Sequence, residues 1–278
     1  RLSVHGTTAR PTGELRVKAS GLAYARTNLD LPAVGPFEGS VVLNEQQLTI
    51  PGFSVRVEDQ PFSVSGAMKL GQNFWTQRRE EVLPYVLANA ELHLEAPEVN
   101  LAAFSERLPE QLRPQGTVVA DVTMRPGRVF AGMIQVREVE TRPLPRVGVV
   151  EEIEADLALH GQQLQVENFS AVLGGETLSV GGRLDFSDES LAKNYPNLEF
   201  SIAGFNLPLA RNPDVILRSD LDLVVRNGSN GVPVISGTAK LRDSFLLRDI
   251  TTLVPGRVAR PERRPPYFSV PQDPLDDW

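Results

Sequence analysis

The stretch Phe62-Ser63-Val64-Ser65-Gly66-Ala67-Met68-Lys69-Leu70 decides the fold class. Its even-numbered positions hold apolar residues and a glycine, whereas Ser63, Ser65 and Lys69 stand between them. Successive side chains of a β-strand point to opposite faces of the sheet, so this alternation predicts a strand with one apolar and one polar face. Such strands are typical of antiparallel sheets that have a single face in water.

The same alternation recurs along the whole chain. The clearest runs have their apolar positions at Phe37, Gly39, Val41 and Leu43; Phe53, Val55 and Val57; Leu92, Leu94 and Ala96; Val118, Ala120, Val122 and Met124; Ile153, Ala155, Leu157 and Leu159; Leu198, Phe200 and Ile202; and Leu221, Leu223 and Val225. We count about twenty strand-like runs in 278 residues, which predicts an all-β protein.

The chain also repeats itself. The segment 46–66 reappears as 162–182 at an offset of 116 residues without a gap, with a shared Gln-Gln-Leu, a Phe and a Ser-Val-x-Gly. A second match pairs 92–101 with 198–207 at an offset of 106. Self-similarity on this scale indicates an array of similar supersecondary units. We expect a first β-repeat unit in residues 1–112 and a second in 113–217.

The one-sided apolar strands must bury their face. They can pack as a closed β-sandwich, or curl into a half-pipe whose interior takes an apolar ligand. Aromatic residues are only 6% of the chain, and the inward positions are mostly Val, Leu and Ile, which favours the groove over a thick core. We predict a long, curved, antiparallel-rich sheet, a β-taco or half-pipe groove, with few short helices; the sandwich is the alternative.

Helices and loops are minor. Asn100 is a predicted N-cap of a short helix that ends before Pro109. We expect one further helical turn in 187–195, a surface insertion in 72–84, and an extended Pro/Arg-rich loop in 257–274. Gly174-Gly175 predicts a hairpin turn and Gly181-Gly182 a β-bulge.

Groups suited to catalysis are sparse. The chain has no cysteine, and its three histidines, His5, His93 and His160, are far apart in sequence. It lacks the Gly-x-Ser-x-Gly elbow of hydrolases and the phosphate-binding Gly-x-x-x-x-Gly-Lys-Ser/Thr loop. Glu152, Glu154 and Asp156 share the polar face of a strand, where a solvated stripe is the expected role instead of a cation site. We expect no enzyme, no cofactor and no bound metal.

The formal charge of −7 and the pI near 5.2 argue against a nucleic-acid surface. The one local basic excess is Arg257, Arg260, Arg263 and Arg264, which could contact lipid headgroups or an acidic partner, or simply keep a Pro-stiffened loop soluble. No apolar run approaches the roughly 18 residues of a membrane helix. Because both ends interrupt the pattern, we expect an internal segment of a longer chain.

The Gln-Gln-Leu-x-Val/Ile progression, followed by Leu/Phe-Ser-Val-x-Gly and Leu-x-Leu/Phe, resembles the AsmA-like proteins of Gram-negative envelopes, and within them the TamB branch. The stretch 237–249 and the Pro-rich residues after it are similar to the entry into that branch's C-terminal domain, which places the start of this domain at 218–278. The resemblance implies a periplasmic protein that is anchored to the inner membrane through segments outside this sequence.

Such proteins form a curved sheet with a hydrophobic groove for phospholipid transport between the membranes, and they assist outer-membrane protein assembly with an Omp85-type partner. The resemblance carries over no catalytic residue. It implies groove positions that would contact phospholipid acyl chains at Leu48, Ile50, Phe53, Phe62 and Val64, and at their repeat mates Leu164, Val166, Phe169, Leu178 and Val180. The alternatives are a chaperone that receives strands of outer-membrane proteins at its sheet edges, and a purely structural array of sandwiches.

Overall fold

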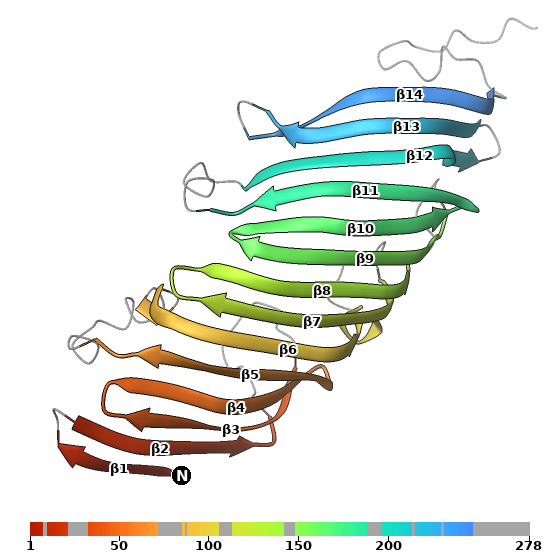
Figure 1. Ribbon diagram of the computed structural model, residues 1–278. Helices are drawn as coiled ribbons and strands as arrows, with labels where there is room; N and C mark the ends of the chain where they lie inside the picture. Colours follow the sequence, from red (N-terminus) through yellow and green to blue (C-terminus); the bar gives the residue numbers. More distant parts are fainter. Residues whose placement is uncertain are drawn as a thin grey trace, which may run out of the picture.

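The described residues form one open β-sheet. The computed structural model describes residues 1–7, 10–21, 33–71, 85–86, 88–105, 113–141, 148–187, 196–212, 215–228 and 231–246. Fourteen strands lie in these ranges, and each pairs with its neighbours in sequence, so that the order across the sheet is the order along the chain (Figure 1). Every pairing is antiparallel. The predicted all-β fold with a curved antiparallel sheet is confirmed.

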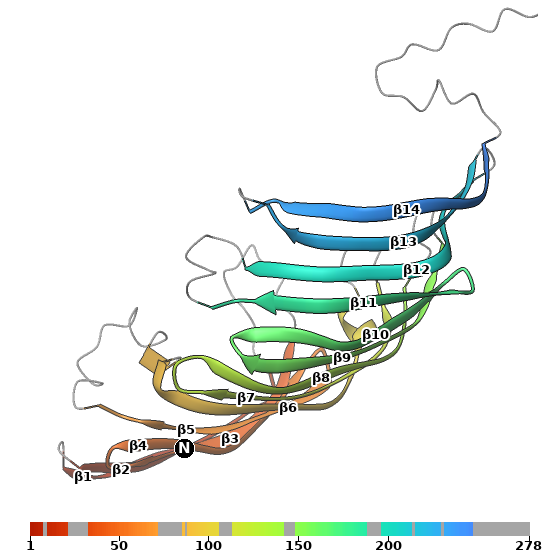
Figure 2. The same cartoon turned by 45° about the horizontal axis from the view of Figure 1, so that its top comes forward.

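The strands are β1 (Leu2–Thr7), β2 (Arg10–Ala19), β3 (Val34–Asn44), β4 (Gln47–Val57), β5 (Gln60–Lys69), β6 (Ala90–Asn100), β7 (Gln115–Arg125), β8 (Val129–Glu140), β9 (Val150–Gly161), β10 (Gln163–Leu173), β11 (Glu176–Asp185), β12 (Asn197–Asn212), β13 (Val215–Asn227) and β14 (Pro233–Leu246). A four-residue 3₁₀ helix, η2 (Leu101–Phe104), follows β6. The sheet rises strand by strand from β1 to β14 (Figure 2).

These strands are fewer and longer than the roughly twenty short runs expected from sequence, because β-bulges divide single strands into separate runs. In β4 the apolar positions Leu48 and Ile50 are even-numbered, whereas Phe53 and Val55 are odd-numbered. The pairing of β4 with β5 shifts between Ile50 and Phe53. A bulge inserts one residue into the strand, so the apolar set changes parity while it stays on one face.

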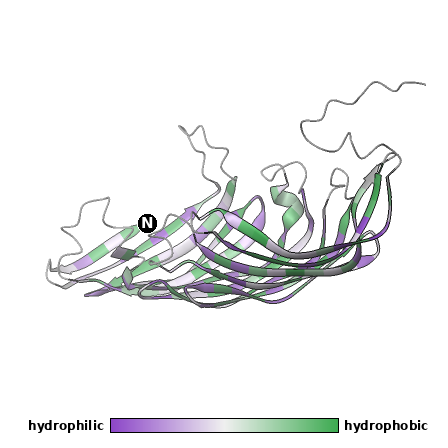
Figure 3. Cartoon of the chain, turned by 90° about the horizontal axis from the view of Figure 1, so that it is seen from above, coloured by the Kyte–Doolittle hydropathy of each residue, from purple (hydrophilic) through white to green (hydrophobic). Residues whose placement is uncertain are grey.

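Comparable bulges interrupt most of the later strands. The register shifts between Ala96 and Val99 in β6, between Val136 and Val139 in β8, and between Gly204 and Leu207 in β12. A bulge bends its strand and increases the local twist. With bulges in many strands, the sheet bends as a whole into an open trough, which is seen in Figure 3.

The sequence repeat is also a structural repeat. In the β4–β5 hairpin, Leu48 pairs with Met68 and Ile50 with Gly66; 116 residues later, Leu164 pairs with Leu184 and Val166 with Gly182. The register shift follows Ile50 in one hairpin and Val166 in the other. The two hairpins therefore have the same register and the same bulge.

The second sequence match needs a correction. Val64 pairs with Leu94 and its repeat mate Val180 pairs with Ile202, so Leu94 corresponds to Ile202, 108 residues later. The offset of 106 is wrong for these strands. The structural offset also equates Val99 with Leu207, two apolar residues that directly follow the bulges of β6 and β12 and are both buried.

The predicted cap at Asn100 is confirmed, since the Ala102 backbone N–H donates to the Asn100 side-chain oxygen at 2.9 Å. Pro109 and the ranges 72–84, 188–195 and 257–274 lie outside the described residues. One feature was not predicted: Tyr85, Val86, Ala88 and Asn89 form a helical turn just before β6. In the described part of the chain, no helix is long and apolar enough to cross a membrane.

Gly174-Gly175 forms the predicted hairpin turn, with φ of 58° and 86°. The bulge predicted at Gly181-Gly182 is wrong, because this pair runs unshifted along β12 and the bulge lies opposite it, on β10. Gly182 has a different role. Its φ is 144°, and a Cβ built on it would lie 2.2 Å from the Glu199 carbonyl oxygen. Only glycine lets β11 and β12 approach this closely.

We predict that Gly182→Ala lowers the free energy of unfolding by about 1–3 kcal/mol, since the new methyl group meets backbone atoms in a strained conformation. Gly52→Ala is the matched control, because a Cβ there meets nothing within 4 Å and its φ is not positive. We expect the control to lie within about 0.5 kcal/mol of the wild type. Urea denaturation followed by circular dichroism measures both, and equal losses would refute the close-approach explanation.

Candidate functional site

An unbroken apolar row crosses most of the sheet. The cross-strand pairs from β2 to β12 link residues that are all apolar or glycine: Val17, Gly39, Phe53, Val64, Leu94, Val122, Gly132, Leu159, Leu164, Leu184 and Leu198. We call these residues the Leu94 row. Eleven neighbouring strands thus place one apolar or glycine position each in a single line.

A second row on the same face extends the apolar surface to the last described strand. Its members, from β6 to β14, are Ala96, Ala120, Ile134, Leu157, Val166, Gly182, Phe200, Val225 and Ile235. At the other end, Leu2 and Val4 of β1 pair with Leu15 and Gly13 on this face. The apolar face is therefore continuous across the described sheet.

The ten groove positions expected from the resemblance all lie on this face. Phe53 pairs with Val64, and Phe169 with Ala155; Val180 pairs with Ile202. The ten residues, all half-buried, are Leu48, Ile50, Phe53, Phe62, Val64, Leu164, Val166, Phe169, Leu178 and Val180. The register thus brings them together on one surface, and lipid binding by them stays a prediction.

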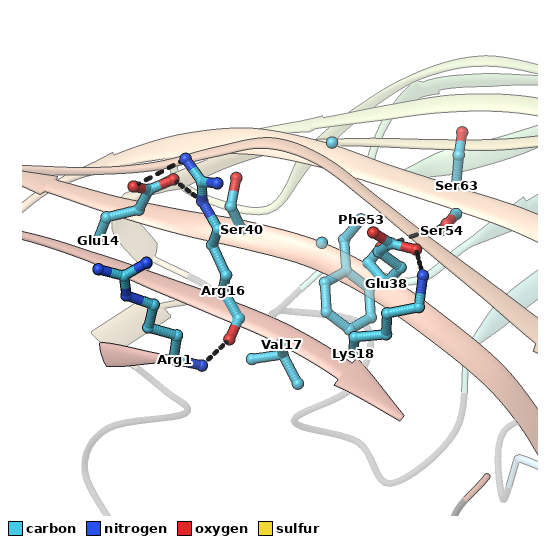
Figure 4. Close-up of a pocket in the computed structure, with 12 residues that line it drawn as sticks. Arg1, Glu14, Arg16, Val17, Lys18, Glu38, Ser40, Phe53, Ser54 and Ser63 are labelled. Carbon is cyan, nitrogen blue, oxygen red and sulfur yellow. Dashed lines mark hydrogen bonds and ion pairs between the residues drawn. The ribbon is translucent and has the colours of Figure 1, made fainter. Parts of the chain in front are cut away.

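The opposite face is polar. In it, Lys18 and Glu38 are joined by an ion pair of 2.8 Å, and Glu199 accepts from Arg183 and Arg226. Exposed pairs of this kind contribute at most about 1 kcal/mol each, so their main effect is solubility. Figure 4 shows Val17 and Phe53 on one side of the sheet and the Lys18 ammonium on the other. The buried apolar side chains Val99, Ala155 and Leu207 all belong to the apolar face, which is therefore the enclosed side of the trough.

One margin of the concave face is buried. Val99, Val139, Ala171 and Leu207 follow the bulges of β6, β8, β10 and β12, and their exposures are 5%, 5%, 0% and 1%. In contrast, Leu94 in the straight part of β6 is 39% exposed. Apolar residues after the bulges are therefore buried along this margin, whereas the floor at Leu94 is open.

At β5 to β7, the helical turn lies on the other margin. Met68, Leu70, Ala90 and Met124 form a buried cluster, against which the Tyr85 and Val86 side chains pack. Among the predicted groove positions, Leu48 also packs against this cluster, so it lies partly under cover. No motif in the sequence signalled the turn, because its contacts connect segments that are distant in sequence.

The titratable residues show no catalytic arrangement within the described ranges. His93 lies on the polar face with its Nδ1 3.1 Å from the Thr123 hydroxyl, while His5 and His160 are exposed. No group of three or more His, Cys, Asp or Glu side chains in these ranges could hold a metal ion. Glu152 and Glu154 are exposed. The basic residues Arg257, Arg260, Arg263 and Arg264 lie outside the described part.

The comparisons with known proteins assign no family. No protein-family model, curated protein or solved structure matches the chain. The resemblance to AsmA-like proteins therefore rests on the quoted residues alone.

The polar face generates a prediction about pH. The Arg137 guanidinium hydrogen-bonds the Asp156 carboxylate at 2.5 Å, and this bond holds the pKa of Asp156 below its ordinary value of 3.8. A carboxylate with a lowered folded-state pKa stabilises the fold above its unfolded pKa, and the contribution is lost as the pH falls through the folded value. We expect Asp156→Asn to reduce the fall in urea midpoint between pH 6 and pH 3. If the urea midpoint of Asp156→Asn falls with pH as much as that of the wild type, the hydrogen bond to Asp156 is not the cause. Arg137→Gln, which removes the other partner of this bond, is the control.

Proposed function

We propose that the concave apolar face binds the hydrocarbon chains of phospholipids, and that the protein is a non-enzymatic lipid-transport segment of an AsmA-like envelope protein. The observation that supports this most is the Leu94 row, in which apolar and glycine positions follow one another across eleven strands. From β2 to β8 every member of the row is half-buried or exposed, so a ligand could reach it. The resemblance adds the expected location, the periplasm, with a tether to the inner membrane outside this sequence.

The physical basis is transfer out of water. Each methylene group of an acyl chain gains about 0.8 kcal/mol when it is fully buried in an apolar surface. Neighbouring strands are about 4.8 Å apart, so the six steps of the Leu94 row from β2 to β8 span about 29 Å. One acyl chain covers about 15 Å, half of a bilayer core of about 30 Å. A chain could therefore occupy successive positions along the row at similar energy, while its polar headgroup stays in water.

The sandwich alternative finds less support. All fourteen strands of the described ranges belong to the same sheet, so none of them forms a second sheet over the apolar face. An apolar surface that no second layer covers is typical of a ligand or partner site.

We predict that Val64→Glu weakens binding of a fluorescent long-chain fatty acid at least tenfold, because a carboxylate in the middle of the row must be desolvated by the ligand. Ser63→Glu, on the polar face of the same strand, is the matched control and should bind like the wild type. Circular dichroism checks that both variants keep the sheet. Equal affinity of a folded Val64→Glu variant would count against the trough as the binding site.

A second function is favoured by the last described strand. β14 pairs only with β13 within the described residues, and its Ile235, Leu241 and Phe245 are 65%, 61% and 61% exposed. A free strand edge offers unpaired backbone groups to an incoming strand. We propose, as the alternative, that this edge receives strands of an outer-membrane protein during assembly with an Omp85-type partner.

The two functions predict different crosslinks. With a photoreactive residue placed at Leu94, the lipid function predicts phospholipid adducts; with one placed at Ser236 on β14, the assembly function predicts peptide adducts from unfolded outer-membrane protein. Mass spectrometry identifies the adducts. Peptide adducts at Ser236 together with no lipid at Leu94 would make strand pairing the better assignment.

A further inference from the structure

The helical turn of Tyr85, Val86, Ala88 and Asn89 is built into the sheet at two points. The Gly71 backbone N–H donates to the Tyr85 hydroxyl at 2.7 Å, and this hydroxyl donates to the Lys69 carbonyl at 3.4 Å, which ties the turn to the end of β5. The Gly127 N–H donates to the Ala88 carbonyl at 3.0 Å, which ties it to the β7–β8 hairpin. Within the turn, the Asn89 side chain donates to the Tyr85 carbonyl at 2.9 Å. The turn thus bridges the strands on either side of β6.

The helical turn covers the apolar face only over a short distance along the strands. Along the apolar side of β6, Ala90 is 1% exposed, Leu92 is half-buried and Leu94 is 39% exposed. On β7, Met124 pairs with Leu92 and is 7% exposed, whereas the next position on this face, Val122, pairs with Leu94 and is half-buried. Alternate residues on one strand face are about 6.7 Å apart. The change from covered to open therefore takes place within one or two steps along the strands.

The open surface is also limited on its other side. Ala96, two residues beyond Leu94, is 3% exposed, and Val99 after the bulge is 5% exposed. Leu92 is half-buried, packs against the Met68–Met124 cluster and pairs with the covered Met124. The floor that stays open on both β6 and β7 is therefore the Leu94 row, about 6.7 Å wide and enough for one hydrocarbon chain laid across the strands.

We propose that Tyr85 and Val86 are positioning residues, which wall off one side of the trough and so place bound hydrocarbon chains on the Leu94 row and away from the Met68–Met124 cluster. This inference rests on the proposed lipid function, because it concerns where on the same face the ligand lies. The turn acts by occupying the apolar surface with its own side chains. Removing it should widen the site toward Met124.

Single-cysteine variants test the wall, since the chain has no cysteine of its own. Leu94→Cys and Met124→Cys lie in adjacent rows of the same face and form a matched pair. We expect an alkyl methanethiosulfonate to modify Leu94→Cys at least tenfold faster than Met124→Cys. In a Tyr85→Ala, Val86→Ala background the Met124→Cys rate should rise at least tenfold, while the Leu94→Cys rate stays the same. Tyr85→Phe is the control background, because it keeps the ring. In it, the modification rate of Leu94→Cys should remain at least tenfold higher than that of Met124→Cys.

Sodium oleate then locates the ligand in the single-cysteine variants that keep Tyr85 and Val86. This part of the test does not use the double variant. Circular dichroism checks that the double variant keeps its fold. Oleate should slow modification of Leu94→Cys at least fivefold and leave Met124→Cys unchanged. Equal rates at the two cysteines without oleate would overturn the wall. Protection of Met124→Cys to the same degree would overturn the placement of the ligand. A slow Met124→Cys with no protection at Leu94→Cys would leave the wall standing but sink the lipid function, and with it the positioning role.

Discussion

The backbone ladder between strands that are neighbours in sequence is the constraint on which this structure depends. Each of the fourteen strands in the described ranges pairs with the strands next to it in sequence, so register passes from one pair to the next without interruption. Side chains alternate with period two, and a slip of one residue would turn the apolar set of a strand to the polar face. The Leu94 row exists because ten successive pairings keep that register, from Val17 on β2 to Leu198 on β12.

Bulges are the second element of this design, because they bend the sheet without losing register. Pro51-Gly52 on β4 and Phe205-Asn206 on β12 occupy the inserted positions, after which the apolar residues resume on the same face. Beyond the bulges Val99 and Leu207 are almost fully buried, although no second sheet lies over them within the described residues. Within these residues, one sheet therefore carries both buried and exposed apolar positions on the same face.

The trough function that we propose needs few specialised residues, which agrees with the sparse motifs of the sequence. Passive binding of hydrocarbon requires apolar area and exclusion of water, and both come from the summed contributions of ordinary Val, Leu, Ile and Phe side chains. Any refinement of the site comes from what covers its margins. The turn at Tyr85 is the clearest example, because its side chains pack against the buried cluster that contains Met68 and Met124.

The sequence by itself determined the fold class, the faces of the strands and the repeat, because period-two alternation and turn glycines are local signals. The runs around Phe62 and Leu221 and the turn at Gly174-Gly175 were predictable for this reason. Only the tertiary structure decided where strands continue through a bulge, since the inserted residue becomes visible only against its partner strand. The same holds for the strand equivalence at 108 residues, for the role of Gly182, and for the cover of Met124 by Tyr85. Each of these depends on contacts between segments that are distant in sequence, and local periodicity contains no information about them.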